Sequence, residues 1–428
     1  MTPRWPDVLR KLHSDEALLV GSNLAARGMG FLVSLLISRI AGVAGLGAYS
    51  TVMITSSSAT TPLTVPLANH GTLMTAKPAS DATTPAQVIA AQMPWFVLSL
   101  MIGLLGSQSM LQASTGQADF PLTSAQTWVI GALLVAGHLL TQWLAGVMHG
   151  ANRSRTVALT SGSLTLVCAL AAYPIILWQG LPGALGLALI CTLGPGLFHV
   201  VQLGLGRSER IRSTPAARVQ LRREAWRRLK QSLPNMGTAV LNTGTNWVCC
   251  IYLMQHFHGM EAVGMVALSL QWMMLMQLVV SSWGGKILHA LALKGGPSGS
   301  DRHGLMCEAK QQIQRCAKVT AASGLAVTLA TPLIAIIYKV DVATLGGLLA
   351  INAAASVLTS VNYVYERVFF LLPTQRAWLV ISTFAYATQL GVTLALSPVS
   401  IMATAIGNLV ACAITMALVR HHLNHSLS

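Results

Sequence analysis

Charged residues are scarce in this sequence. Asp, Glu, Lys and Arg together make up 9% of the 428 residues, whereas soluble domains usually carry about a quarter. Hydrophobic residues make up 53%, which is more than the core of a soluble domain can bury. A lipid bilayer accepts this composition, because each spanning helix needs about 20 mainly apolar residues. The composition therefore excludes a soluble globular protein and predicts an integral membrane protein.

Acidic residues are especially few, with 12 Asp and Glu against 27 Lys and Arg, and the formal net charge is +15. Such an excess is also typical of nucleic-acid-binding proteins. In membrane proteins, however, Lys and Arg accumulate in cytoplasmic loops, where they set the topology and contact anionic lipids. We therefore expect anionic membrane lipids, and no nucleic acid, as partners of these charges.

Catalytic and metal-binding motifs are missing. The sequence contains no GxxxxGK[ST], HExxH or GxSxG motif, and its seven cysteines form no CxxC or Cys/His pattern. The loops expected outside the cell are short, and the longest of them, 112–124, holds only Asp119 as a charge. The sequence therefore predicts no enzyme, cofactor or metal, and it disfavours an integral membrane polymerase or transferase.

Twelve apolar runs of about span length follow one another along the chain. They lie near 17–41, 47–74, 87–111, 125–148, 156–178, 182–206, 233–257, 262–292, 313–338, 342–365, 375–396 and 399–420. We predict an all-α integral membrane protein with about 12 transmembrane helices in two six-helix lobes. Residues 1–206 form the N-terminal lobe, 207–231 a basic cytoplasmic linker, and 232–428 the C-terminal lobe.

The distribution of basic residues predicts the orientation. If the N-terminus is cytoplasmic, every Lys and Arg except Arg27, Arg39 and Lys339 falls in a segment on the cytoplasmic side. Both termini are then cytoplasmic. The first apolar run follows a polar N-terminus and shows no cleavage site, so we expect it to be a retained span.

The linker has two interpretations. Its second half could form a basic helix on the membrane surface, with a few apolar side chains on the other side. It could equally be a solvated linker that only sets the topology. The basic residues concerned are Arg222, Arg223, Arg227, Arg228 and Lys230.

The two halves look like repeats of each other. At an offset of 217 residues, Gly42 pairs with Gly259 and Gly47 pairs with Gly264, each pair following a first span. Six spans per half give both halves the same orientation. We therefore predict a parallel repeat about an axis along the membrane normal.

Polar residues inside spans are costly in lipid and mark candidate cavity positions. In the first span, Asn23, Arg27 and Ser34 share one helical face, and Arg39 lies at its outer rim. Arg27 lies about 15 Å into the predicted span, without an Asp or Glu at similar depth. We expect it to face a hydrated cavity that receives an anion; the alternative is hydrogen bonding to carbonyls of a broken helix.

Further candidates are hydroxyl and amide groups. Thr60 and Thr64 lie in a hydroxyl-rich second span that Pro62 and Pro66 should bend. A helix surface rich in hydroxyl groups suits contact with water or a sugar, but small polar residues also pack helices together. The later spans contribute amides that suit carbohydrate or interhelical hydrogen bonds equally well: Asn242, Asn246, Gln271 and Asn352.

The segment NLAARGMGFLVSLLISRIAGVAGLGAYS (23–50) resembles the first span and loop of Wzx-type polysaccharide flippases. The matching positions are Arg39, Gly42, Gly45, Gly47 and Tyr49. These flippases belong to the multidrug/oligosaccharidyl-lipid/polysaccharide (MOP) exporter superfamily, which also contains the MATE transporters. The resemblance implies two six-helix lobes around a central cavity, lined by the first two spans of each lobe and opened by alternating access.

The resemblance also implies a function. Such a flippase moves an undecaprenyl-pyrophosphate-linked oligosaccharide repeat unit across the bacterial inner membrane, for synthesis of O-antigen, capsule or exopolysaccharide. It implies that Arg27 holds the pyrophosphate, and that a polysaccharide polymerase and a chain-length regulator act as partners. The chain has no two-helix extension like that of lipid II flippases after its twelfth run, which favours a polysaccharide precursor.

A cation-coupled multidrug exporter of the same fold is the alternative, with H⁺ or Na⁺ as the coupling ion. Coupled export usually needs a carboxylate embedded in the membrane. Glu366 lies at the cytoplasmic edge of its predicted span, and none lies deeper. That absence favours the flippase.

Overall fold

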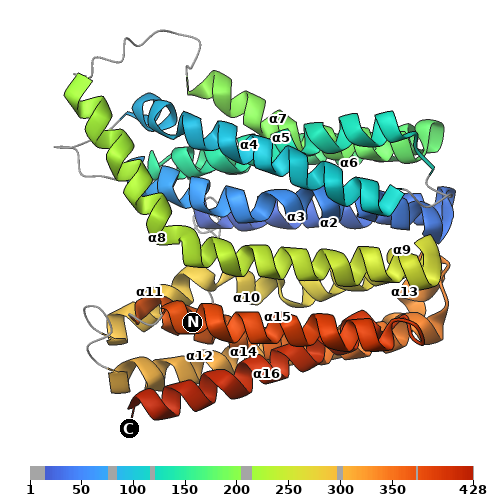
Figure 1. Ribbon diagram of the computed structural model, residues 1–428. Coiled ribbons are helices and arrows are strands. Elements are labelled where there is room, and N and C mark those ends of the chain that lie inside the picture. The colour runs from blue at the N-terminus through green and yellow to red at the C-terminus, as the bar shows by residue number, and fades with distance from the viewer. Residues whose placement is uncertain are drawn as a thin grey trace, which may run out of the picture. The chain divides into compact units, whose positions relative to one another are not determined.

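The computed structural model describes residues 15–75, 84–115, 121–203, 215–295, 302–372 and 375–427. Every regular element among these residues is a helix (Figure 1). This confirms the all-α prediction for the described part of the chain. Lys77, residues 1–14, residues 207–214 of the linker and residues 116–120 of the long loop lie outside it.

The first half contains six long helices. They are α2 (Asp15–Ile40), α3 (Gly42–Thr75), α4 (Pro85–Thr115), α5 (Ser124–Gly150), α6 (Ser154–Gln179) and α7 (Leu181–Gln202). Each has between 22 and 34 residues, which at 1.5 Å per residue is enough to cross the apolar core of a bilayer. They coincide with the six apolar runs predicted for this half.

The second half is more broken. Its elements are α8 (Pro215–Trp247), the π-helix η2 (Val248–Leu253), α9 (Met254–Met276), α10 (Leu278–Ser282), α11 (Gly284–Gly295), α12 (Arg302–Leu329), α13 (Thr331–Tyr338), α14 (Val342–Leu371), α15 (Gln375–Leu396) and α16 (Ala403–Leu427). The run expected over 262–292 is divided among three helices. The helices α12 and α13 meet at a bend of 55°, where Pro332 removes a helical hydrogen bond.

Nine helices in the described residues are long and apolar enough to cross a membrane, or ten if the bent pair α12 and α13 counts as one span. Two features explain the difference from twelve. The stretch Ser232–Met276 counts once although its 45 residues are about twice a span, and Gly259 breaks it with a φ of 77°. The 34-residue helix α3 is not among the nine because its Ser and Thr residues lower its hydropathy.

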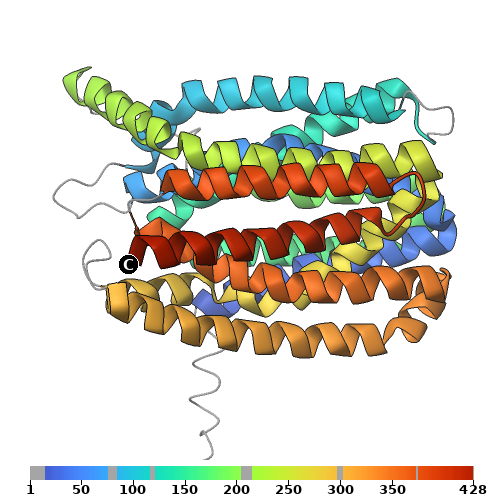
Figure 2. The same cartoon turned by 60° about the horizontal axis from the view of Figure 1, so that its bottom comes forward.

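The chain divides into two compact units. Unit 1 contains the chain up to Ala41 together with Ala48–Thr243, and unit 2 contains Gly42–Gly47 together with Gly244–Ser428. The chain therefore passes from unit 1 to unit 2 for the last time inside α8, beyond the linker at which the sequence predicted the division. Within each unit the long helices run nearly parallel to one another (Figures 1 and 2).

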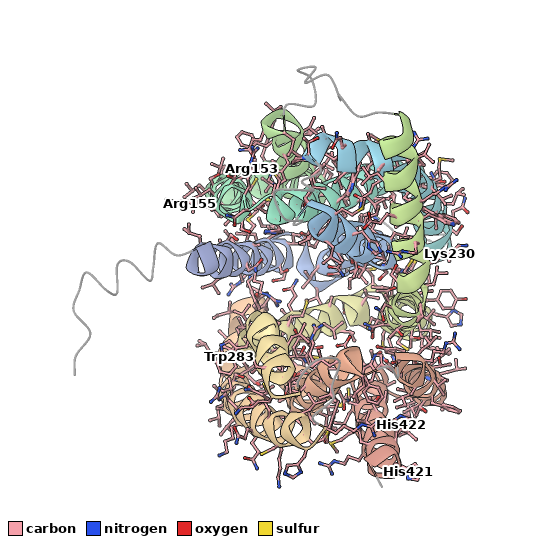
Figure 3. The ribbon with its side chains drawn as sticks, turned by 90° about the vertical axis from the view of Figure 1, so that its left-hand side faces the viewer. Arg153, Arg155, Lys230, Trp283, His421 and His422 are labelled. Carbon is pink, nitrogen blue, oxygen red and sulfur yellow. The ribbon has the colours of Figure 1, made fainter. Side chains whose placement is uncertain are left out.

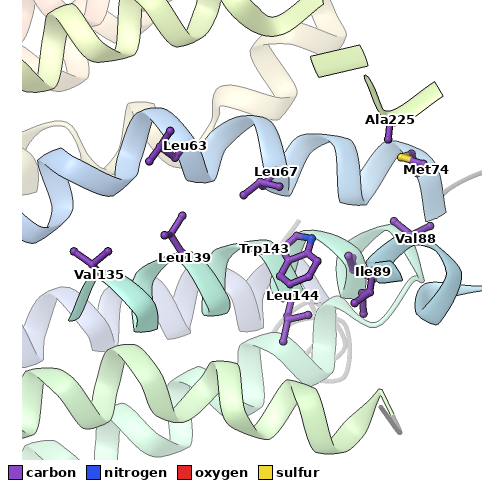
Figure 4. Close-up of a cluster of buried hydrophobic side chains, with 11 residues drawn as sticks. Leu63, Leu67, Met74, Val88, Ile89, Val135, Leu139, Trp143, Leu144 and Ala225 are labelled. Atoms are coloured by element: carbon purple, nitrogen blue, oxygen red, sulfur yellow. The ribbon is translucent and has the colours of Figure 1, made fainter. Parts of the chain in front are cut away.

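Unit 1 is held together around α5, which packs against α4 and α7, while α2 packs against α6. Trp143 of α5 lies in a cluster of buried side chains that includes Leu67 and Val147 (Figure 4). Its indole nitrogen donates a 2.6 Å hydrogen bond to Oε1 of Gln92, which is also buried. Because lipid tails are as apolar as leucine, such close packing and internal hydrogen bonds hold spans together.

Unit 2 is organised around α14, which packs against α12, α16 and α9. Two buried clusters cover the helix on its C-terminal half, where Val364 and Val368 belong to one cluster and Phe369 to the other. The outward surfaces of both units are apolar: Trp178 is 84% exposed and Ile336 68% exposed. Such exposed surface fits contact with lipid chains.

The predicted repeat is visible at its glycines. Gly42 and Gly259 both have positive φ values, of 73° and 77°, a conformation that glycine adopts without steric cost. A Cβ atom on Gly47 would collide with the carbonyl oxygen of Met260, and one on Gly264 would collide with that of Val43. Val43 and Met260 are separated by the same offset as the glycine pairs. The two contacts are reciprocal, and both lie within unit 2.

The variants Gly47→Ala and Gly264→Ala test this close approach of α3 and α9, which we call the crossing. Each added methyl group meets a backbone carbonyl, so each variant should lose about 1–3 kcal/mol of stability through overpacking. The measurement is the melting temperature of the purified protein in detergent. Gly244→Ala is the matched control, because nothing lies within 4 Å of a Cβ atom at that helical glycine. Equal melting temperatures for Gly264→Ala and Gly244→Ala would contradict the crossing.

Candidate functional site

The polar face predicted for the first span is divided in the structure. In α2, Asn23 is exposed and Arg27 is half-buried. Farther along the same helix Ser34 is fully buried, and Ser38 is 4% exposed with its hydroxyl donating to the carbonyl of Leu35. The accessible polar positions of α2 are therefore in its first half, whereas the later serines lie inside the packed helix bundle.

Arg27 lies in the first half of α2, which begins at Asp15. Residues 17–20 before it are apolar and read Ala-Leu-Leu-Val. The depth of Arg27, about 15 Å into the span, therefore stays a prediction from the sequence.

Arg39 lies in the last turn of α2 and is exposed. A cation there is favoured by the negative end of the helix dipole. It is 12 residues from Arg27, which places the two Cα atoms about 18 Å apart along the helix axis. The two arginines are therefore more than three helical turns apart.

Thr60 and Thr64 are buried in α3, at 1% and 6% exposure. The Thr60 hydroxyl donates to the carbonyl of Ser56 at 2.9 Å, and the Thr64 hydroxyl donates to that of Thr61 at 3.1 Å. Hydrogen bonds of this kind to the preceding turn bend helices slightly and satisfy the hydroxyl without a ligand. The geometry of both residues thus fits helix packing, while the half-buried Ser58 leaves a hydroxyl position more accessible.

Asn246 is paired across unit 2. Its Oδ1 accepts a 3.0 Å hydrogen bond from Nε2 of Gln389 in α15. The π-helix η2 follows immediately, and the carbonyl of its Cys249 accepts a hydrogen bond from the hydroxyl of Thr404 at 3.1 Å. Single-turn π segments are frequent at functional sites because they re-aim side chains. Asn246 itself stays half-exposed beside this irregular turn.

Asn352 serves the packing of unit 2. It is 1% exposed, and its Nδ2 donates a 3.1 Å hydrogen bond to Oγ of Ser269, which joins α14 to α9. Gln271 lies two residues farther along α9 and is half-buried. Asn242 is half-buried in α8 and belongs to unit 1. The ten candidates therefore divide between the units, with Asn246, Gln271 and Asn352 in unit 2 and the others in unit 1.

Sequence analysis missed two residues that the structure connects to candidates, Gln389 and Ser269. Apart from Gln375 at its first position, the apolar run 375–396 contains Gln389 as its one amide, so the position of Gln389 was an available signal. Ser269 could not be found in this way, because a single serine in a span is common. Its role emerges only from the packing of α9 against α14.

Asp341 is a titratable group that serves the fold. It caps α14, and its carboxylate accepts a 2.7 Å hydrogen bond from the backbone nitrogen of Thr344. Hydrogen bonding to Thr344 lowers the pKa of this carboxyl below its ordinary value. Among the described residues, no group of three or more His, Cys, Asp or Glu side chains is placed to hold a metal ion.

No family model matches the chain, and no curated protein matches it. Solved structures do match, over nearly the whole length. One is an inward-facing multidrug resistance MATE family transporter of the MOP superfamily, at a TM-score of 0.69 and 17% identity over 93% of this chain and 95% of that one. The lipid II flippase MurJ, in an inward closed conformation, matches at a TM-score of 0.70 and 12% identity over 94% of this chain and 86% of its own.

A third match is a MOP superfamily transporter from Pyrococcus furiosus, at a TM-score of 0.62 and 16% identity over 96% of this chain and 95% of the other. The chain has the fold of the MOP superfamily transporters. At these identities the likeness concerns the fold alone. Because MOP transporters with this fold include both a multidrug transporter and a lipid II flippase, the cargo must be argued from the side chains.

The variants Asn352→Ala and Asn23→Ala distinguish a packing amide from an exposed one. Removing the buried amide of Asn352 leaves Ser269 without its donor, so unfolding should become easier by about 1 kcal/mol, the scale of interhelical hydrogen bonds in membranes. Asn23→Ala removes an exposed amide and should leave the melting temperature unchanged. Thermal unfolding in detergent measures both. A melting temperature of Asn352→Ala equal to that of the unaltered protein would contradict the packing role.

Proposed function

We propose that this protein is a flippase that carries an undecaprenyl-pyrophosphate-linked oligosaccharide repeat unit across the bacterial inner membrane by alternating access. The repeat unit that has crossed the membrane would supply surface polysaccharide synthesis. The observation that carries the proposal is Arg27, a half-buried guanidinium inside a span of a MOP-fold transporter. A charged side chain in a span is costly and marks a functional position by default.

The chemistry of Arg27 suits a pyrophosphate. A guanidinium is planar, always charged, and presents several donors that match phosphate oxygens in pairs. The surrounding helix surface is not crowded, because nothing lies within 4 Å of a Cβ atom at the neighbouring Gly28 or Gly30. Arg27 is therefore placed where an anionic headgroup can approach the backbone of α2 closely.

The remaining cargo is a glycan and a lipid tail. Half-buried amides at Asn242, Asn246 and Gln271, and the exposed Asn23, offer the hydrogen-bonding groups that sugar hydroxyls require. The tail would remain in the bilayer, so that only the headgroup crosses. In this proposal the two units rock as rigid bodies, and a polysaccharide polymerase and a chain-length regulator receive the product.

The direct test is a strain that lacks this protein. The undecaprenyl-linked oligosaccharide should accumulate on the cytoplasmic side, where an added periplasmic enzyme cannot reach it. Reintroducing the gene should restore access. Normal access in the deletion strain, together with altered sensitivity to cationic drugs, would reject the flippase and support the exporter.

Arg27→Ala should decrease transport by about 10–100-fold while the folded protein remains in the membrane, because charge-assisted hydrogen bonds to the headgroup are lost. Arg27→Lys should retain more transport because the charge persists. Arg155→Ala is the matched control, because Arg155 is exposed at the start of α6. Normal surface glycan with Arg27→Ala, at normal expression, would refute the role of Arg27.

The alternative is a multidrug exporter coupled to H⁺ or Na⁺, which the likeness to MATE transporters supports. In that case Glu366 is the residue to examine, because it lies about one turn from the end of the span Val342–Phe369. Glu366→Gln would then abolish drug resistance. The flippase proposal expects Glu366→Gln to leave access to the lipid-linked oligosaccharide intact.

A further inference from the structure

The first half of α8 has two chemically different faces. Ala225 and Leu229 are buried at 4% and 9% exposure, and Leu221 on the same side is partly buried. Four exposed cations lie on the same stretch of helix: Arg222, Arg223, Arg227 and Lys230. We call these four residues the basic face of α8. Successive residues turn by about 100°, so Arg223, Arg227 and Lys230 lie on the side opposite the buried residues, while Arg222 lies at the border, close to Leu229.

The apolar side is already used for packing within unit 1. Ala225 belongs to the buried cluster that contains Met74, Val88 and Ile89 (Figure 4). Trp226 stacks on Trp95 with their ring centroids 4.5 Å apart. This segment is therefore docked on its own unit. It is neither a solvated linker nor a helix with a free apolar face for insertion into the bilayer.

The basic face lies close to the membrane. The apolar span that continues from this helix begins at Ser232, only two residues after Lys230. At 1.5 Å per residue, the four cations lie about 3–15 Å along the helix from the start of the span. The polar headgroup zone on each side of the hydrocarbon core is about 5–8 Å thick.

The helix also bends at this level. Figure 1 shows α8 bent between its two halves, and Pro234 lies in that part of its sequence. Trp226, which is 46% exposed, is a residue type enriched at membrane interfaces. Nζ of Lys230 lies 5.3 Å from the centre of the Trp226 ring. An aromatic ring and a cation therefore lie together just before the start of the span.

Other cations mark the same end of unit 1. Arg153 and Arg155 are exposed at the junction of α5 and α6. Figure 3 shows them at the same end of unit 1 as Lys230. The charge distribution of the whole sequence assigns this end to the cytoplasmic side, whose leaflet is anionic. Charge complementarity therefore favours a lipid partner.

We propose that the basic face of α8 docks on the headgroups of anionic phospholipids, such as phosphatidylglycerol, in the cytoplasmic leaflet. The contact is electrostatic, because the apolar side of the helix is occupied by unit 1. It holds the end of unit 1 at the membrane surface. This inference stands whether the cargo is a lipid-linked oligosaccharide or a drug.

The test uses the full-length protein purified in a neutral detergent. Phosphatidylglycerol or phosphatidylcholine is added, and bound lipid is counted by native mass spectrometry at increasing salt concentration. The test variant is Arg222→Gln/Arg223→Gln/Arg227→Gln. The matched control, Lys310→Gln/Arg315→Gln/Lys318→Gln, removes three exposed cations from α12 in unit 2. Melting temperatures confirm that both variants are folded.

The unaltered protein should prefer phosphatidylglycerol, and the preference should weaken with salt. Each cation near an anionic surface strengthens binding roughly fivefold, so the α8 variant should lose about 100-fold of that preference while the control keeps it. Equal loss in both variants would overturn the proposal by showing a general charge effect. No preference in the unaltered protein would also overturn it and leave an acidic protein segment as the occupant of the basic face.

Discussion

Inside a bilayer, every polar group of the backbone must find its hydrogen bond within the protein, since no water is there to supply one. Two irregular helical segments show how carbonyls find partners within the protein. The hydroxyls of α3 donate to carbonyls of their own helix beside two prolines. The carbonyl of Cys249 in the π segment accepts from Thr404. Polar side chains that resemble a binding site can therefore be explained first by the hydrogen bonds that they donate to backbone carbonyls.

Internal hydrogen bonding and exposure divide the candidate residues into two groups. Thr60, Thr64 and Asn352 have internal partners and low exposure, so their geometry fits a packed fold. Arg27, Asn23, Asn242 and Gln271 are more accessible. A guanidinium carries five N–H donors, whereas a threonine hydroxyl carries one, which a single carbonyl can accept. The proposed transport function therefore depends mainly on Arg27 and the accessible amides.

The sequence predicted the fold well because two strong signals were available. Apolar runs located the helices, and the glycine pairs at a fixed offset located the repeat, whose crossing the structure shows between Gly47 and Gly264. Features that depend on packing could not be predicted from the sequence. The docking of Ala225 in the buried cluster of unit 1 could not be read from a basic linker.

The assignment of Gly42–Gly47 to unit 2 has a mechanical consequence for α3. This helix starts in unit 2, whereas its far end is fastened to α5 of unit 1, where Thr72 donates to the carbonyl of Gly146. Pro62 and Pro66 already lie in unit 1, because Leu63 and Leu67 beside them belong to its buried cluster. The stretch of α3 between Gly47 and Leu63 therefore joins the anchored parts of the helix. Any movement of one unit would be taken up by bending of this stretch, and no loop would need to unfold.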